Sequence, residues 1–190
     1  MKSYGKWIIA LCTLAALGSR IAWADENCQV SLSRATVAFP PMQRNDNVGS
    51  QQNWFKMPSR DINVSIYCPQ PQVMALFVHG AAGPQGRFLF GNGGGLALKA
   101  SQMILDGRSY MIGKTTDRNE FIPADGHADT QLLHNNEAII AIENNEAARG
   151  QQLNFTLTLT LTPVLNEKQF RNVSDNTEME SNLSWELLTH

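Results

Sequence analysis

Cys28 and Cys68 are the residues of this sequence whose types most directly suggest chemistry. In an exported protein they would be oxidised to a disulfide, which closes a loop of about 40 residues and stabilises the fold by roughly 2–4 kcal/mol. The alternative is a pair of free thiols, or a catalytic thiol with His79, His127 or His134 as its base. That alternative has no local sequence signature and needs a reduced thiol outside the cell. The sequence therefore favours a disulfide.

A polar segment, PADGHADTQLLH, carries side chains of the types that bind calcium or zinc. They are Asp125, His127, Asp129 and His134. Their spacing does not match a known calcium or zinc loop, and exposed loops are commonly rich in Asp, His and Gly. We therefore predict neither a metal site nor a cofactor in this segment.

The glycine run FGNGGG, residues 90–95, could be taken for a phosphate-binding loop. It matches neither the dinucleotide-binding spacing nor the P-loop spacing, and the lysine and the helix that should follow are missing. A hairpin turn that uses the conformational freedom of glycine is the favoured interpretation. Because the sequence also lacks the G-x-S-x-G, H-E-x-x-H and paired-carboxylate motifs, we predict that the protein is not an enzyme.

Residues 1–24 have the pattern of a secretory signal peptide. Lys2 and Lys6 give a positive start, an apolar stretch of 11 residues follows from Trp7, and Ala22-Trp23-Ala24 provides a cleavage site. The apolar stretch is shorter than the roughly 20 residues that span a bilayer. We therefore predict an exported, soluble chain, with residues 25–190 forming one domain.

The predicted mature chain is mildly acidic. Residues 1–24 hold three of the 15 basic residues and none of the 17 acidic ones, so residues 25–190 carry a formal charge of 12 minus 17, or −5. This balance argues against binding to nucleic acid or to an anionic membrane.

Alternating apolar residues are the main structural pattern of the chain. Between residues 152 and 162, leucine and phenylalanine alternate with threonine and asparagine, which predicts a half-buried strand. Shorter strands are predicted at CQVSLSRATV, INVSIYC, VMALFV, RFLF, GLALKA, SYMIG and AIIAI, with loops at 42–61 and 115–137. Around eight short strands without convincing helices favour an all-β, antiparallel sandwich.

Two segments are candidates for contact with another molecule. Trp54 and Phe55 lie in a polar loop, where they either form a recognition surface or close one end of the sandwich. The last residues, SNLSWELLTH, place Leu183, Trp185 and Leu187 on one face of a strand. That strand pairs either with its own sheet neighbours alone or also with a strand from another protein.

Taken together, these features resemble the fimbrial subunits of the bacterial chaperone–usher pathway. The matching features are the export signal, a first-strand cysteine (Cys28) with a second near the end of the next strand (Cys68), the segment GRFLFGNGGGLALKASQMILDG, and the closing strands LNFTLTLTLTP and LSWELL. The resemblance implies an incomplete immunoglobulin-like sandwich with six strands instead of seven. A periplasmic chaperone would lend the missing strand, an outer-membrane usher would receive the subunit, and a neighbouring subunit would then donate its own strand.

The resemblance also implies which residues make these contacts. The apolar residues of the last two strands would meet the lent or donated strand, and chaperone cations would hold the carboxylate at the chain end. The residues concerned are Leu153, Phe155, Leu157, Leu183, Trp185, Leu187 and His190.

The chain differs from the family pattern in two places that bear on its role. Thr189 stands at the penultimate position where a tyrosine is typical, and the last glycine is Gly150, which suggests a divergent minor subunit. Only Asp25 to Asn27 precede Cys28 after the predicted cleavage, whereas a donor strand needs about ten residues at about 3.3 Å each. The resemblance therefore implies a subunit that receives a strand without giving one, at the tip of a cell-surface fibre. Such a subunit either binds a host-surface receptor or has a structural role alone. The alternative is a self-complete secreted β-sandwich that binds a small ligand or carbohydrate.

Overall fold

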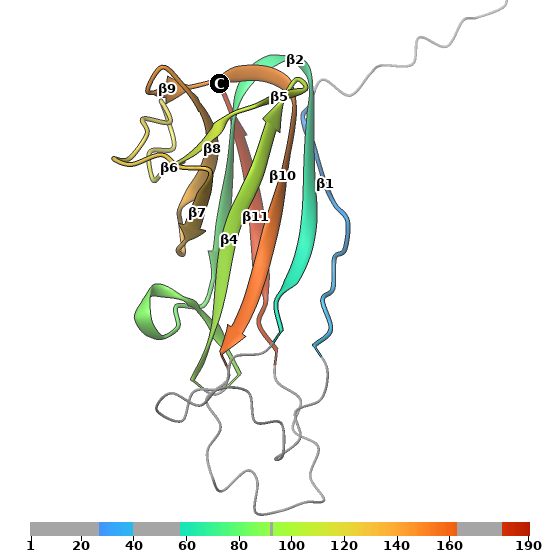
Figure 1. The fold of residues 1–190 in the computed structure, drawn as a ribbon, viewed down its shortest axis with the longest axis vertical. Helices are drawn as coiled ribbons and strands as arrows, with labels where there is room; N and C mark the ends of the chain where they lie inside the picture. The colour runs from blue at the N-terminus through green and yellow to red at the C-terminus, as the bar shows by residue number, and fades with distance from the viewer. Residues whose placement is uncertain (1–26, 40–57, 92, 163–179) are drawn as a thin grey trace, which may run out of the picture.

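The computed structural model describes residues 27–39, 58–91, 93–162 and 180–190 (Figure 1). The predicted signal peptide and the candidate recognition residues Trp54 and Phe55 lie outside these ranges. Within them, the chain forms β-strands, turns and one 3₁₀ turn, η1 (Pro84–Gly86). No helix in the described part of the chain is long and apolar enough to cross a membrane.

The described strands form one curled antiparallel sheet. This confirms the predicted all-β, antiparallel class. The strands are β1 (Gln29–Leu32), β2 (Arg60–Gly80), β3 (Phe88–Phe90), β4 (Gly94–Leu105), β5 (Arg108–Ser109), β6 (Met111–Thr115), β7 (Thr130–Leu133), β8 (Ala138–Glu143), β9 (Glu146–Ala147), β10 (Arg149–Thr162) and β11 (Leu183–Thr189). The glycine run joins β3 to β4, as expected of a hairpin turn.

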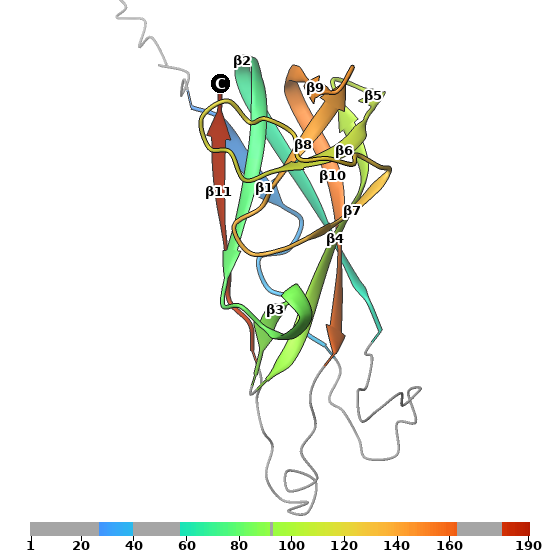
Figure 2. The same ribbon diagram turned by 90° about the vertical axis from the view of Figure 1, so that its left-hand side faces the viewer.

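Strand β2 connects the two halves of the curled sheet. Its first half pairs with β1 and β10, and its second half pairs with β11 and β8 (Figures 1 and 2). The sequence predicted two separate strands here, INVSIYC and VMALFV. That prediction was wrong, because the chain continues as one strand of 21 residues through Pro69 and Pro71.

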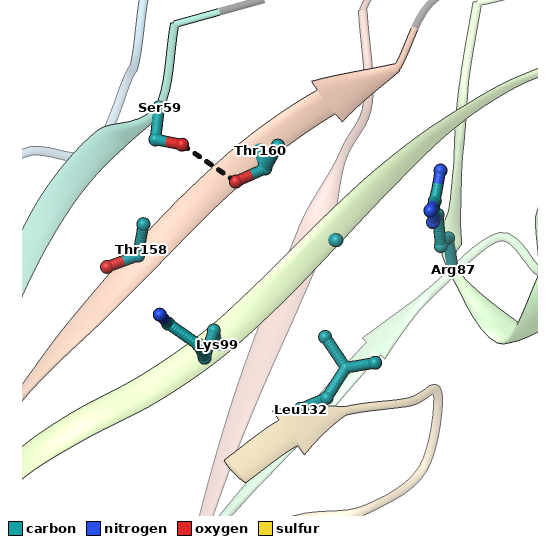
Figure 3. Close-up of a pocket in the computed structure, with 7 residues that line it drawn as sticks. Ser59, Arg87, Lys99, Leu132, Thr158 and Thr160 are labelled. Carbon is teal, nitrogen blue, oxygen red and sulfur yellow. Dashed lines mark hydrogen bonds between the residues drawn. The ribbon is translucent and has the colours of Figure 1, made fainter. Parts of the chain in front are cut away.

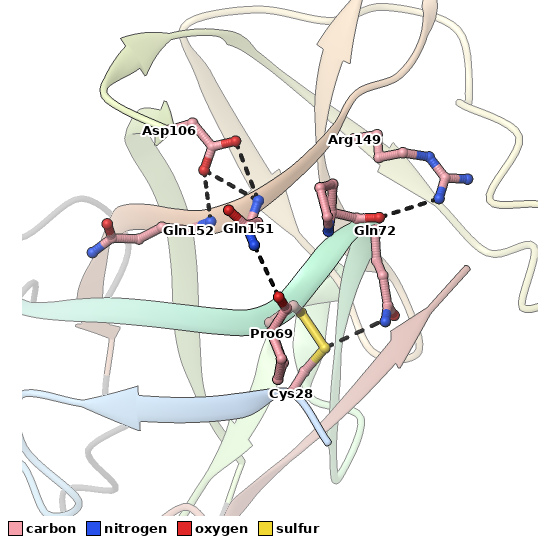
Figure 4. Close-up of a disulfide and its surroundings, with 9 residues drawn as sticks. Cys28, Pro69, Gln72, Asp106, Arg149, Gln151 and Gln152 are labelled. Carbon is pink, nitrogen blue, oxygen red and sulfur yellow. Dashed lines mark hydrogen bonds between the residues drawn. A yellow bond between two sulfur atoms is a disulfide. The ribbon is translucent and has the colours of Figure 1, made fainter. Parts of the chain in front are cut away.

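The two prolines have no N–H to contribute to the sheet, and side chains of β10 bond to their carbonyl groups. The Gln151 side chain donates a hydrogen bond to the Pro69 carbonyl at 2.9 Å, and Arg149 donates one to the Pro71 carbonyl at 3.3 Å (Figure 4). The Asp106 carboxylate in turn accepts the backbone N–H groups of Gln151 and Gln152, where the register of β10 against β2 shifts. Polar side chains therefore bond to backbone groups at the point where β2 passes from one half of the sheet to the other.

The predicted disulfide forms beside this passage. Cys28 and Cys68 are bonded, with their Cα atoms 4.2 Å apart (Figure 4). Cys68 is fully buried, while Cys28 is partly exposed just before β1. The bond ties the start of the described chain to the middle of β2.

The main apolar core contains residues from both halves of the sheet. Ile62, Val64 and Ile66 come from the first half of β2, and Leu76 and Val78 come from the second half. The alternating leucines and phenylalanine of β10 belong to the same core, with Leu153, Phe155 and Leu157 only 0%, 3% and 0% exposed. The alternation predicted for this segment is therefore confirmed, with the threonines Thr156, Thr158 and Thr160 on the opposite face.

A second, smaller apolar cluster lies on the other face of the second half of β2. Ala75 and Phe77 pack there with Ala138 and Ile140 of β8. Phe121, from the segment between β6 and β7, is 2% exposed and covers this cluster. Figure 2 shows that segment passing across β2. The prediction of a loop over 115–137 was therefore wrong in part: Phe121 is packed against the sheet, and Thr130–Leu133 forms β7, which pairs with β4.

Candidate functional site

Strand β11 forms an edge of the sheet. It pairs with β2 from Leu183, opposite Gly80, to Thr189, opposite Met74. Among the described residues, β2 is the only strand that pairs with β11. Within the described part of the chain, the backbone on the other side of β11 is therefore not paired with a strand.

The hydrogen bonds of the β2–β11 ladder show which residues face the open side. His190 and Val73 exchange two backbone bonds, of 2.9 and 3.1 Å. Val78 instead bonds to Asn136 and Glu137 on the β8 side, so its opposite residue, Trp185, is not in a hydrogen-bonded pair. Because such pairs alternate along an antiparallel ladder, the N–H and C=O groups of alternate residues point away from β2. These residues are Leu183, Trp185, Leu187 and Thr189.

The same stretch also presents apolar side chains. Leu183, Trp185 and Leu187 pack against the main core but stay only half-buried. Leu32, Val37 and Phe39, in and after β1, are likewise half-buried and packed against this core. An additional strand beside β11 would extend the sheet and cover apolar surface at this margin.

Ionic contacts fix the opposite face of β11. Glu186 accepts a hydrogen bond from Arg118, and its other oxygen lies 2.9 Å from His79 Nε2. The Arg118 guanidinium also lies 4.6 Å from the centre of the Phe77 ring, within cation–π range. The hydrogen bond from Arg118, followed by that from His79, holds the pKa of Glu186 below its usual value. These contacts connect β11 to β2 and to the segment between β6 and β7.

The chain end is also held in place. Besides its backbone bonds to Val73, His190 meets the Phe121 ring edge to face, with ring centroids 6.3 Å apart. Of the predicted contact residues, Leu183, Trp185 and Leu187 therefore lie on β11, and His190 follows this strand directly. The structure brings them together at its open edge.

The other three predicted contact residues lie elsewhere in the sheet. Leu153, Phe155 and Leu157 are buried in β10, which pairs with β2 on one side and β4 on the other. Their backbone has no open edge for an added strand. Any contact between these residues and a donor strand would therefore be made by side chains within the core.

The candidate metal-binding side chains do not gather. Asp125, His127 and Asp129 are exposed on the segment between β6 and β7, and His134 bonds to Glu137. Nowhere in the described ranges do three or more His, Cys, Asp or Glu side chains form a cluster that could hold a metal ion.

Sequence reasoning missed a second ionic cluster, centred on Glu137. Lys114 Nζ lies 2.9 and 3.1 Å from its two carboxylate oxygens, and the His134 N–H is 2.9 Å away. Burial opposes ionisation of Glu137, but the hydrogen bonds from Lys114 and His134 outweigh it and keep its pKa below the usual value. Because Lys114 is 23 residues from Glu137, only the pairing of β6 with β8 brings them together.

Comparison with known proteins provides no closer assignment. No protein-family model matches the chain, and no significant relative is found among curated proteins.

Proposed function

We propose that this protein is a minor subunit of a surface fibre assembled by the chaperone–usher pathway, and that it receives a strand from another protein at β11. The observation that carries the proposal is the edge of β11. Four residues turn their backbone hydrogen-bonding groups to the open side, and three of them present half-buried apolar side chains to the core.

A donated strand would satisfy both features at once. Its backbone would pair with the outward groups of Leu183, Trp185, Leu187 and Thr189, which is the usual mode of β-strand addition. Its apolar side chains would complete the burial of three large residues, contributing roughly 1 kcal/mol for each side chain that is already half covered. An edge of this kind favours aggregation while it is unpaired. The subunit would therefore need a carrier protein that covers the edge before assembly.

The arrangement of the strands supports an incomplete immunoglobulin-like sandwich. In this interpretation one layer is β1, β10, β4 and the first half of β2, and the other is β11, β8, β6 and the second half of β2. The missing strand would lie beside β11. The disulfide joins the first strand to the second, as in the family that the sequence resembles.

The partners follow from this role. A periplasmic chaperone would occupy the β11 edge first and hold the carboxylate of His190, an outer-membrane usher would receive the complex, and a neighbouring subunit would then supply its strand. The protein would reach the cell surface as part of the fibre. We predict that the protein lies at the tip of the fibre and that it can contact a receptor there.

Covalent addition of a strand tests the proposal. A segment of about ten residues with alternating apolar side chains is fused after His190 through a short turn, so that it can fold back beside β11. We expect the fusion to be monomeric and to melt at a higher temperature than the unmodified mature protein.

The matched control carries the same fusion with serine at every apolar position. It should show no increase in melting temperature, because it cannot bury Leu183, Trp185 and Leu187. Equal stabilisation by both fusions would contradict the proposal. So would an unmodified protein that is monomeric and cooperatively folded alone and gains nothing from either fusion.

A further inference from the structure

Residues 116–129, which we call the strap, join β6 to β7 and reach across the second half of the sheet. The strands of this half are ordered β11, β2, β8 and β6, so β6 and β11 lie at opposite sides of it. The strap begins at β6, yet it contacts β11 through the hydrogen bond from Arg118 to Glu186, and it contacts the chain end through Phe121 and His190. Figure 2 shows it crossing β2 on the way. The strap therefore connects the two outer strands of this half by side-chain contacts.

Short hydrogen bonds hold the turn that carries Arg118. Thr115 Oγ1 donates to the Ile122 carbonyl at 2.7 Å and accepts the Asp117 N–H at 3.0 Å. The Asp117 carboxylate in turn accepts the N–H groups of Asn119 at 3.0 Å and of Ile122 at 3.3 Å. The backbone on both sides of Arg118 is therefore fixed, which reduces the conformational entropy that its side-chain contacts must overcome.

The Arg118 guanidinium makes two contacts at once. It donates to one oxygen of Glu186, and it lies 4.6 Å from the centre of the Phe77 ring. Phe77 is fully buried and stands directly opposite Glu186 in the β2–β11 ladder. A planar guanidinium can bond to a carboxylate and stack on a ring in the same position. Arg118 therefore bridges a residue of β11 and its partner in β2.

The second oxygen of Glu186 is held from β2. It lies 2.9 Å from His79 Nε2, and His79 Nδ1 lies 2.8 Å from Asn136 Oδ1. An isolated ion pair as exposed as Arg118 and Glu186, at 44% and 40%, would contribute little to stability. Here both oxygens of the carboxylate are engaged, so the pair belongs to a network that fixes the position of Glu186.

Strand β11 is short and lies next to the chain end. Its seven residues pair with β2, and chain ends fray unless other contacts tie them down. Glu186 alternates with Trp185 and Leu187, which pack against the main core. Arg118 therefore holds β11 from the face opposite the core and does not occupy the edge at which a strand would be added.

We propose that Arg118 is a positioning residue for strand addition. Acting through Glu186, it keeps β11 paired with β2 before a strand is added at the other edge. The inference rests on the proposed function for the purpose of that edge, whereas the contact itself needs no partner. Once a strand has been added, β11 is held on both sides and the contribution of Arg118 becomes small.

Amide hydrogen exchange on the full mature protein tests the proposal. In Arg118→Gln, the amides of Ser184, Glu186 and Leu188, which bond to β2, should exchange about tenfold faster than in the wild type. The amides of β10 should be unchanged, because that strand stays paired with β2 and β4 when β11 opens locally. Arg118→Lys keeps the charge and should stay closer to the wild type.

Further variants separate this role from a general loss of stability. The matched control is Arg108→Gln, the same change at an exposed arginine of β5, which should leave β11 unaffected. Adding Arg118→Gln to Glu186→Gln should have little further effect, because the first change then removes a contact that is already lost. In a fused protein that the apolar strand stabilises, Arg118→Gln should have little effect on β11.

Four results would overturn the proposal: unchanged exchange of the β11 amides in folded Arg118→Gln, equal acceleration in β10 and β11, an undiminished effect in the Glu186→Gln background, or an undiminished effect in a stabilised fusion. The first three need no added strand. If the fused strand fails to stabilise the protein while Arg118→Gln still loosens β11, the strand-acceptor role is lost and the contact remains. If the fused strand stabilises the protein while Arg118→Gln leaves β11 unchanged, only this inference is lost.

Discussion

Three carboxyl groups in the structure are stabilised in their charged form. Backbone N–H groups of Asn119 and Ile122 lower the pKa of Asp117. Hydrogen bonds from Arg118 and then His79 lower the pKa of Glu186. Burial would raise the pKa of Glu137, but hydrogen bonds from Lys114 and His134 lower it. All three lie on or beside the second half of the sheet. Their ionisation therefore contributes to the stability of the region that carries β11.

This charge pattern predicts that the protein loses stability in acid. A carboxyl whose pKa is lower in the folded state contributes fully above its unfolded pKa, and the contribution disappears as the pH falls through the folded pKa. For Glu137 the window therefore begins near the ordinary value of 4.5 and extends below it. The free energy of unfolding, measured by denaturant titration between about pH 7 and pH 3, should fall less steeply in Glu137→Gln than in the wild type. Identical pH dependence in the two proteins would contradict the assigned role of Glu137.

The disulfide gives a second prediction at the residue scale. Replacing Cys28 by serine should lower the free energy of unfolding by roughly 2–4 kcal/mol, because the unfolded chain regains the freedom of a loop of about 40 residues. The double variant Cys28→Ser, Cys68→Ser is the control, since it leaves no unpaired thiol. Unchanged yield and thermal stability in both variants would show that the bond is not structural.

At the scale of elements, β10 and β11 should respond differently to truncation. Leu157→Ala in β10 removes a fully buried side chain and should cost about 2–5 kcal/mol. Leu187→Ala in β11 should cost less, because Leu187 is only half-buried. In the protein with the fused apolar strand, the cost of Leu187→Ala should rise toward that of Leu157→Ala. Denaturant titration of Leu157→Ala and Leu187→Ala, each with and without the fused strand, checks this. If Leu187→Ala costs the same free energy of unfolding with and without the fused strand, the result would argue against contact at this edge.

The elements also show what could be predicted from the sequence. The alternation of leucine with threonine in β10 was a sufficient signal, because a strand with one buried face has a period of two residues. The same rule placed Leu183, Trp185 and Leu187 on one face of β11. The continuity of β2 was missed because Pro69 and Pro71 normally end a strand, and the side chains of Arg149 and Gln151 that bond to the proline carbonyls are about 80 residues away. The grouping of Lys99, Thr158 and Leu132 around a hollow on the sheet (Figure 3) was missed for a similar reason, because the register of the strands, not sequence spacing, brings these residues together.

At the scale of the whole molecule, the proposed function requires a direction of assembly. The purified mature protein, mixed with a synthetic peptide of alternating apolar residues, should bind the peptide. Mixed with a second subunit that lacks its strand, it should fail to cap that subunit, because no donor segment is predicted between Ala24 and Cys28. Native mass spectrometry distinguishes these complexes. Capping of the second subunit by this chain would contradict the predicted tip position.

The most direct test of the open edge is amide hydrogen exchange along β11. In the protein without an added strand, the amides of Trp185, Leu187 and Thr189 should exchange rapidly, while those of Ser184, Glu186 and Leu188, bonded to β2, should be protected. The fused apolar strand should protect both sets, and the serine control should leave the alternation unchanged. If Trp185, Leu187 and Thr189 are already protected in the protein alone, the edge is not open and the strand-acceptor account is wrong.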